Sequence, residues 1–582
     1  MTRPIRVLLA AIAVLLAEPP HAIAQVPDLS GVWVAKLRFG PDIRGPLIIT
    51  RTGNDWAADM AGFRVPARVD GKDISFALPD SKGKFRGKFS GNEIAGHWTG
   101  TRDFPYATLV TLLPEGVSKW RGDVEPLENT TTFFMPLKRA EDGSYTTYLR
   151  NPESNAGRFI PVTTLKVKGN VIELSGKRGM YSTGVYDDGV LRLLVNGQSF
   201  DFERNRDSTS SFYSRGRNPP RYSYSKPLAL DDDWPVATVD DVGISRAQIE
   251  KFIQVLSEIS DDSITTPMPH SVLIARHGKL VLEEYFHGTD RDTPHDLRSA
   301  SKSWVSMLLG AAMHTGVPIK LSTPVYQTML GAVPANLDPR KKSMTLEHLI
   351  SMTAGYNCGS QDAPGDEDVM QSQDSVDDWY RYTLNVPMLT APGDTIVYCS
   401  IEANLAGGML QKIAGESLAD MSYRLLSKPM KMSNYSLFIS PVGDVYGGGG
   451  HRFTSRDFLK WAQLMLNEGK WNGRQIMSKE WVDKSGSAMR LLFGKQSYGY
   501  LWNSYEFDWN GRKVRAIFAG GNGGQVSMAI PALDMAIVFT GANYGQAQTF
   551  TSQQVFIPKY ILPAVNPQAC RTLNERTSSC RD

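Results

Sequence analysis

The sequence predicts two architectures in one chain: an all-β domain of barrel or sandwich type, then an α+β domain with an antiparallel sheet flanked by helices plus a helical insert. Short β-rich runs separated by Gly, Asn and Asp turns fill residues 25–225. From residue 241 onward, apolar residues recur with a helical period and later with the two-residue period of strands. The chain has 582 residues, too many for one hydrophobic core, so more than one domain is expected.

The first 24 residues have the pattern of a secretory signal peptide. Arg3 and Arg6 precede an apolar run at 7–17, and Ala22-Ile23-Ala24 is a small-x-small cleavage site. We therefore expect cleavage after Ala24 and a periplasmic or secreted protein. The alternative, a short membrane anchor, is disfavoured by the cleavage pattern, and no other stretch is long and apolar enough to predict a membrane span.

Composition excludes several classes of function. The net charge is +3 with both signs mixed along the chain, so neither nucleic acid nor an anionic membrane surface is an expected partner. No nucleotide-binding motif appears beside a suitable strand and helix, and no pair of Cys or His residues has metal-ligand spacing. We expect no cofactor and no metal. The oligomeric state does not follow from the sequence.

The β domain is predicted from short runs that begin at Gly31-Val32-Trp33 and recur at intervals typical of sandwiches and barrels. A weaker repeat follows at 145–149, 171–174 and 190–194, which is consistent with two similar halves. We find no catalytic arrangement here, and its tryptophans are interpreted as core residues rather than as a ligand platform.

A polar stretch at 226–240 is interpreted as a linker to an α+β domain at 241–566, with 567–582 as a C-terminal tail. Ser245 and Gln248 form a capping box before a helix. Two strands at 271–275 and 280–285 are joined through His277-Gly278 as a hairpin, and a mostly helical region follows at about 296–490. The remaining elements are four strands, with Asn510-Gly511 as one turn, and a final helix: 498–503, 514–518, 526–530, 535–540 and 551–563.

Ser-x-x-Lys occurs three times, but only Ser299/Lys302 leads into a helical pattern. The apolar residues from Trp304 to Ala312 recur at helical spacing, and Gly316 ends the run. Residues three apart on a helix are neighbours, so Lys302 would lie beside Ser299 and could accept its proton. The alternative is a serine cap with a solvated lysine.

Two later motifs favour the chemical interpretation. Tyr398-Cys399-Ser400 supplies a phenol for proton relay, and the glycine cluster 520–525 lets a strand edge approach a substrate closely. Nucleophile, base, relay and oxyanion site are the parts that acyl transfer needs.

These motifs resemble the serine β-lactamase-like superfamily, which includes class C β-lactamases, D,D-peptidases, esterases and 6-aminohexanoate-dimer hydrolases. The resemblance covers about residues 235–565 and is carried by Ser299 to Lys302, Tyr398 to Ser400 and Gly520 to Gln525. It implies Ser299 as nucleophile, Lys302 as proton acceptor and Tyr398 as relay. The backbone N–H groups of Ser299 and Gln525 would form the oxyanion hole. Substrate would also contact four further residues: Ser400, Asn522, Gly523 and Gly524.

Two departures from the family pattern bear on the substrate. Members that handle β-lactams carry Lys or His where this chain has Asn522, which offers hydrogen bonds but no charge. They usually carry Asn where this chain has Ser400. Both departures favour the esterase and amide-hydrolase branch, with a small-molecule ester or amide as substrate.

Four cysteines remain after export. An even number in an oxidising compartment predicts two disulfides. Cys570 and Cys580 are close in sequence and could pair, in which case Cys358 could pair with Cys399, but the connectivity does not follow from the sequence. The alternative is free, buried thiols. Among the other polar residues, His295 and His451 are interpreted as surface or structural, and Glu402 as a solvated or paired helix residue. Asn404 could either cap a helix or line the cleft.

The leading hypothesis is an exported serine hydrolase that works through an acyl-enzyme. One alternative is a penicillin-recognising D,D-peptidase or β-lactamase. The other is a non-catalytic protein that binds an envelope ligand through its β domain, which the presence of Ser299, Lys302 and Tyr398 disfavours.

Overall fold

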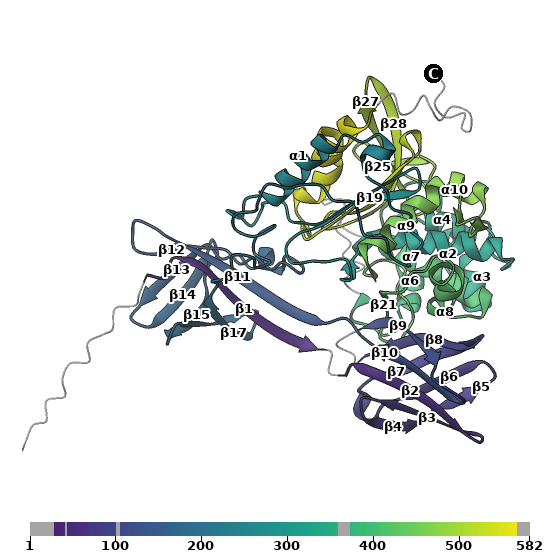
Figure 1. Ribbon diagram of the computed structural model, residues 1–582. Coiled ribbons are helices and arrows are strands. Elements are labelled where there is room, and N and C mark those ends of the chain that lie inside the picture. Colours follow the sequence, from purple (N-terminus) through teal and green to yellow (C-terminus); the bar gives the residue numbers. More distant parts are fainter. Residues whose placement is uncertain (1–27, 41–42, 101–104, 359–372, 567–582) are drawn as a thin grey trace, which may run out of the picture. The chain divides into compact units, whose positions relative to one another are not determined.

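A computed structural model describes residues 28–40, 43–100, 105–358 and 373–566 (Figure 1). The predicted signal peptide, the predicted tail and the cysteines at 570 and 580 lie outside these ranges. The chain divides into two compact units. The first comprises residues up to 35, 135–149 and 160–205, and the second the rest.

The first unit is built on a closed antiparallel barrel, with strands in the order β1-β11-β12-β13-β14-β15-β16-β17. Its side chains alternate as strand geometry requires: in β16, Leu191, Leu193 and Val195 are buried while Leu194 is exposed. The strands are Gly31–Gly40, Asn129–Arg139, Tyr145–Thr146, Thr164–Lys168, Val171–Gly176, Gly179–Asp187, Val190–Val195 and Gln198–Arg204.

The second unit begins with a separate antiparallel sheet in the order β4-β3-β2-β10-β9-β8-β7-β6-β5. Its core includes Phe85 and Trp98, as expected for the tryptophans of this region. The strands are Gly45–Thr52 (β2), Asp55–Met60, Phe63–Pro66, Arg68–Asp70, Asp73–Ala77, Lys84–Ser90, Glu93–Thr99, Tyr106–Pro114 and Lys119–Val124 (β10).

The predicted fold class is confirmed, but the β region is not a simple pair of successive halves. Strand β1 belongs to the same barrel as β11–β17, while β2–β10 form the other sheet. That sheet also extends into the α+β region, because β9 pairs with β21 (Tyr435–Phe438), with Thr108 opposite Ser436. Strand pairing across more than 300 residues leaves no local pattern in a sequence. The domain boundaries proposed from composition remain predictions.

The α+β region is organised around an eight-stranded antiparallel sheet in the order β19-β18-β30-β29-β28-β27-β26-β25. The predicted turns at His277-Gly278 and Asn510-Gly511 are present, and all four residues have φ between 49° and 76°, as type I′ hairpin turns require. The strands are Pro269–Arg276 (β18), Lys279–Tyr285, Arg490–Phe493 (β25), Gln496–Tyr498, Asn503–Trp509, Arg512–Gly521, Gln525–Ile530 and Met535–Gly541 (β30).

One predicted strand, 498–503, is wrong. Strand β26 ends at Tyr498 and β27 begins at Asn503, and the residues between them turn. Leu501 has φ of 60° and donates its N–H to the carbonyl of Ile350. The apolar run that suggested a strand is instead a turn buried against a helix.

Helices cover the sheet and form the insert. Helix α1 begins after Ser245, whose Oγ accepts the N–H of Gln248 as predicted. The final helical segment is present but wound as a π-helix over Ser552–Ile561, with Pro558 inside it. The α-helices are Arg246–Ser257 (α1), Ser301–His314 (α2), Val325–Leu330 (α3), Leu346–Ile350 (α4), Trp379–Asn385 (α6), Ser400–Ala414 (α7), Leu418–Ser422 (α8), Ser455–Leu466 (α9) and Lys479–Ser485 (α10). Within the described ranges, none of the helices has the length and hydropathy to cross a bilayer.

Candidate active site

Ser299 lies in a short 3-10 turn, Arg298–Ala300, that leads directly into helix α2. Arg298 has φ of 47°, an uncommon conformation for a residue with a side chain. The next residue, Ser301, ties the end of this turn to the segment around His451, because its Oγ accepts the N–H of His451. The half-buried Ser299 is therefore presented on a sharply bent backbone at the start of a buried helix.

Lys302 is the point at which the predicted residues converge. Its side chain is buried, and Nζ lies 3.0 Å from Ser299 Oγ. Nζ also donates to the carbonyl of Gly448 at 2.7 Å and lies 4.7 Å from the ring centroid of Tyr398. The structure thus brings together the three residues predicted for catalysis and rejects the solvated-lysine alternative.

The glycine run at 447–450 fixes the lysine. A Cβ on Gly447 would lie 2.7 Å from the carbonyl oxygen of Ala403, and a Cβ on Gly448 would lie 2.8 Å from that of Ser400. Asn404 Oδ1 accepts the N–H of Gly447. Asn404 therefore does not cap a helix: it lies within α7 and holds this loop against the helix. That Asn404 lines the cleft stays a prediction.

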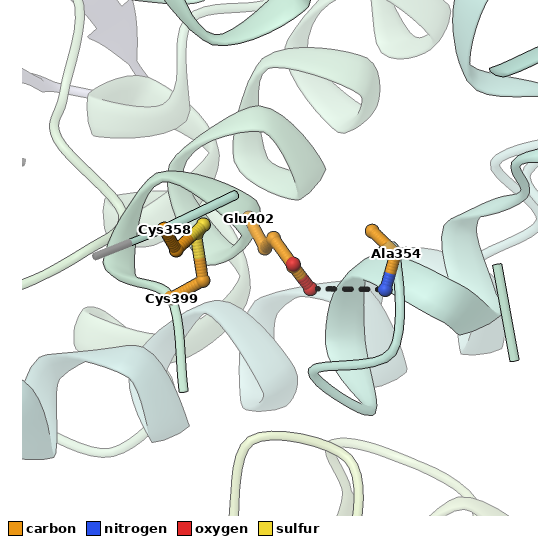
Figure 2. The surroundings of a disulfide bond; sticks show 4 residues. All are labelled: Ala354, Cys358, Cys399 and Glu402. Carbon is orange, nitrogen blue, oxygen red and sulfur yellow. Dashed lines mark hydrogen bonds between the residues drawn. A yellow bond between two sulfur atoms is a disulfide. The ribbon is translucent and has the colours of Figure 1, made fainter. Parts of the chain in front are cut away.

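Tyr398 is held by a disulfide that forms next to it. Cys399 is the N-cap residue of α7 and is bonded to Cys358, as predicted, with 5.6 Å between the α-carbons (Figure 2). Ser400, the first residue of the helix, is buried beside it. The Tyr398 ring also packs edge-on against Tyr498, with the centroids 6.5 Å apart.

Of the two alternatives predicted for Glu402, a solvated or a paired helix residue, the structure excludes the first, because the side chain is buried and hydrogen-bonded on α7. Its carboxylate points toward Ala354 and accepts the N–H of that residue at 3.4 Å (Figure 2), and it has an oxygen within 4.8 Å of both sulfurs of the Cys358–Cys399 bridge. Glu402 and the two cysteines form the single cluster of potential metal ligands in the described ranges. Since both sulfurs are consumed by the disulfide, the cluster does not fit a metal ion.

The third motif lies at the hairpin between β28 and β29. A Cβ on Gly521 would lie 2.2 Å from the carbonyl oxygen of Leu297, so the end of β28 packs closely against the turn Arg298–Ala300. This turn carries the predicted nucleophile Ser299 and is named the nucleophile turn. Asn522 is exposed, whereas Gly523 and Gly524 are buried. Gln525 opens β29 with a buried side chain, whose amide binds both the carbonyl and the N–H of Gly541. The contacts of Gln525 thus tie the hairpin to β30.

The two histidines near the site are structural, as one of the predicted alternatives had it, but neither lies at the surface. Burial lowers the pKa of His295 and of His451 to about 3, so both are neutral near pH 7. His451 packs edge-on against Trp304, with the centroids 4.7 Å apart, and His295 Nε2 lies 2.8 Å from His270 Nδ1. Neither ring has a contact with Ser299 among the described interactions.

Sequence reasoning missed two groups beside the third motif. The Tyr544 ring, buried, lies under the guanidinium of Arg298 at 4.8 Å. Arg158, from the segment between β12 and β13, donates to the carbonyl of Tyr544 and lies against Gly545. Arg158 is separated from the motif by more than 350 residues in the sequence, so no local signal could have identified it.

The fold and the site define a domain of the β-lactamase-like hydrolase class. Residues 266–549 match the Beta-lactamase family model. The chain is 24% identical over 222 residues to the 6-aminohexanoate-dimer hydrolase of Paenarthrobacter ureafaciens. The match covers 36% of this chain and 55% of the relative, so the chain spans just over half the length of that curated protein.

Solved structures give matches of the same kind. A putative 6-aminohexanoate-dimer hydrolase from Bacillus anthracis is 18% identical, with a TM-score of 0.43, and the match covers 53% of this chain and 80% of that one. EstCE1, described as a hydrolase with promiscuous acyltransferase activity, is 16% identical with a TM-score of 0.41, and the match covers 55% of this chain and 97% of that one.

Proposed function

We propose that the protein is a serine hydrolase that cleaves an ester or amide bond through an acyl-enzyme on Ser299. The observation that carries the proposal is the 3.0 Å separation between Lys302 Nζ and Ser299 Oγ, in a buried setting and beside the Tyr398 ring. A hydroxyl is activated when a proton acceptor lies within hydrogen-bond reach of it and a third group holds that acceptor in place. Here the third group is the Gly448 carbonyl.

In this proposal, Lys302 Nζ takes the proton of Ser299 as Oγ attacks the substrate carbonyl carbon. Tyr398 passes a proton to the leaving alcohol or amine when the C–O or C–N bond breaks. Tyr398 then takes a proton from water as the water oxygen attacks the acyl carbonyl carbon. Lys302 returns its proton to Ser299 Oγ as the bond between serine and the acyl group breaks, which releases the acid and restores all three side chains.

The developing oxyanion requires preorganised N–H donors. The N–H of Ser299 at the start of α2 is one, and the family resemblance assigns the other to Gln525. The close approach of Gly521 to Leu297 supports a role for the end of β28, because a Cβ on Gly521 would lie 2.2 Å from the carbonyl oxygen of Leu297. We therefore propose that Gly521 and Asn522 frame the oxyanion site, while Gln525 sets the position of their hairpin.

The proposed substrate is a small ester or amide. The curated relative is named for hydrolysis of the dimer of an amino acid, which supports the amide option. Asn522, exposed and uncharged, gives no support to β-lactam handling at that position. Export remains part of the proposal and agrees with the Cys358–Cys399 bridge, since disulfides persist in oxidising compartments. Sequencing the mature N-terminus should yield Gln25 as its first residue.

Covalent labelling tests the chemistry directly. A fluorophosphonate probe should label the wild type at Ser299, and Ser299→Ala should abolish both labelling and ester turnover. Ser81→Ala is the matched control, because Ser81 and Lys84 form another Ser-x-x-Lys pair outside the site. Equal labelling of the wild type and Ser299→Ala would refute the proposal. Acylation of Ser299 by a fluorescent penicillin would instead favour the penicillin-recognising alternative.

A further inference from the structure

A cationic group outside the hydrolase family segment lies against the third motif. Arg158 belongs to the 3-10 turn Ala156–Phe159, between β12 and β13. Its guanidinium lies flat on Gly545, where a Cβ would be 2.5 Å from Nη1 and 2.8 Å from Cζ. Gly545 has no side chain to separate the guanidinium from the backbone, so the cation is held close to the end of the sheet.

A series of contacts through other residues connects Arg158 to the nucleophile turn. The N–H of Gly545 donates to Asn522 Oδ1 at 2.5 Å. Asn522 follows Gly521, where a Cβ would lie 2.2 Å from the carbonyl oxygen of Leu297 and 3.1 Å from the nitrogen of Ala300. The contacts from the guanidinium to the turn that bears Ser299 therefore pass in order through Gly545, Asn522 and Gly521.

The charge of Arg158 is not matched by an acid among the described residues. Its interactions there are the Tyr544 carbonyl and the ring of Phe159, whose centroid lies 4.8 Å from Cζ. The neighbouring Arg298 differs, because its Nε lies 3.1 Å from the carboxylate of Asp296. Burial alone lowers the pKa of Arg158, which is the sign of a partly desolvated cation without a carboxylate partner.

We propose that Arg158 binds an anionic group of the substrate, so that the enzyme prefers esters or amides that carry a carboxylate. Arginine suits this role because its fork of N–H donors pairs with both oxygens of a carboxylate. Asn522 fixes the hairpin beside it but supplies no charge. The largely exposed Phe159 ring adds an apolar surface next to the cation. This inference rests on the proposed hydrolase function and assigns its substrate class.

The test uses full-length protein and matched ester pairs. In one pair the carboxylate is on the leaving group (3-acetoxybenzoate against its methyl ester), and in the other it is on the acyl portion (phenyl hydrogen adipate against phenyl methyl adipate). The wild type should prefer the anionic member of at least one pair. Arg158→Gln should lower kcat/KM for that member about 10- to 100-fold, the loss expected for one charged hydrogen-bond pair, and leave the neutral ester within about twofold.

Three controls separate the outcomes. Arg158→Lys keeps the charge and should retain part of the preference, and raised salt should weaken it. Arg474→Gln, at an exposed position on strand β24 (Arg474–Gln475), should leave kcat/KM unchanged for both the anionic and the neutral ester. If the wild type hydrolyses neutral esters but Arg158→Gln affects both members of each pair equally, this inference is overturned while the hydrolase proposal stands. If no ester or amide is hydrolysed and Ser299 does not label, both are overturned.

Discussion

Lys302 Nζ lies between Ser299 Oγ, at 3.0 Å, and the carbonyl oxygen of Gly448, at 2.7 Å. The second contact matters as much as the first. The hydrogen bond to Gly448 orients the amine toward the serine. The four-glycine loop that supplies this carbonyl fits closely between helix α7 and the nucleophile turn. Position, rather than the presence of a lysine alone, distinguishes this Ser-x-x-Lys from the other two in the chain.

Lys302→Met should remove the proton acceptor while keeping an unbranched side chain of similar length, although the Gly448 carbonyl loses the hydrogen bond from Nζ. We expect kcat for a small ester to fall by about 10²–10⁴-fold, the usual contribution of a positioned base, while the fold is retained. Steady-state kinetics and circular dichroism measure both quantities. Lys412→Met, at an exposed position on α7, is the control and should keep wild-type kcat. Retention of wild-type kcat by Lys302→Met would assign the base elsewhere.

Gly521→Ala tests the contact between the third motif and the nucleophile turn. The added methyl group would lie 2.2 Å from the carbonyl oxygen of Leu297, a backbone atom that cannot move without shifting Ser299. We expect a loss of activity of 10²-fold or more, on the order of the effect of disturbing an oxyanion site, measured as kcat/KM with a neutral ester.

Its control is Gly71→Asn in the β5–β6 turn. Gly71 has φ of 60°, which asparagine tolerates, and open space around it, so activity should be unchanged. A Gly521→Ala enzyme with wild-type kinetics would show that β28 is not part of the site.

The sequence predicted the central helix, the hairpins at 277–278 and 510–511, and the three catalytic candidates, because each depends on local spacing or turn chemistry. Three features were beyond its reach. Pairing of β9 with β21 and approach of Arg158 to Tyr544 depend on residues more than 300 positions apart. The burial of Glu402 depends on the Cys358–Cys399 bridge and the chain around Ala354. The β9–β21 pairing also means that deleting the β region would expose the edge of β21.

Removing the disulfide should destabilise the protein while leaving the three predicted catalytic side chains in place. The bridge closes a loop of 41 residues, for which the chain-entropy model gives about 4 kcal/mol of unfolding free energy. We expect the Cys358→Ala/Cys399→Ala double variant to show a clearly lower urea midpoint than the wild type. Because Cys399 adjoins Tyr398, turnover should also fall, although labelling of Ser299 by a fluorophosphonate should persist. A double variant with an unchanged midpoint would show that the bridge does not form.

Buried histidines should make the fold sensitive to mild acid. Burial lowers the pKa of His97 to about 4 and those of His295 and His451 to about 3, and it lowers those of His270 and His287 well below 6.5. The unfolded chain binds protons at these positions near pH 6.5, whereas the folded chain does not. Stability is therefore fully present above pH 6.5 and is lost as the pH falls toward the folded-state values. Each histidine contributes about 1.4 kcal/mol per pH unit in that window.

The share of one histidine can be isolated at His97, on β8, whose Nε2 lies 3.3 Å from the hydroxyl of Tyr435. We expect urea midpoints of the wild type to drop steeply between pH 6 and pH 4.5. The same curves give the free energy of unfolding at each pH. His97→Gln should reduce the dependence of that free energy on pH by about 1.4 kcal/mol per pH unit, since glutamine does not titrate. Thr108→Val is the control, because Thr108 Oγ1 bonds to Ser436 in the same β9–β21 contact and does not ionise. That variant should lower stability equally at every pH. A slope for His97→Gln equal to that of the wild type would mean that His97 is protonated in the folded protein or accessible to solvent.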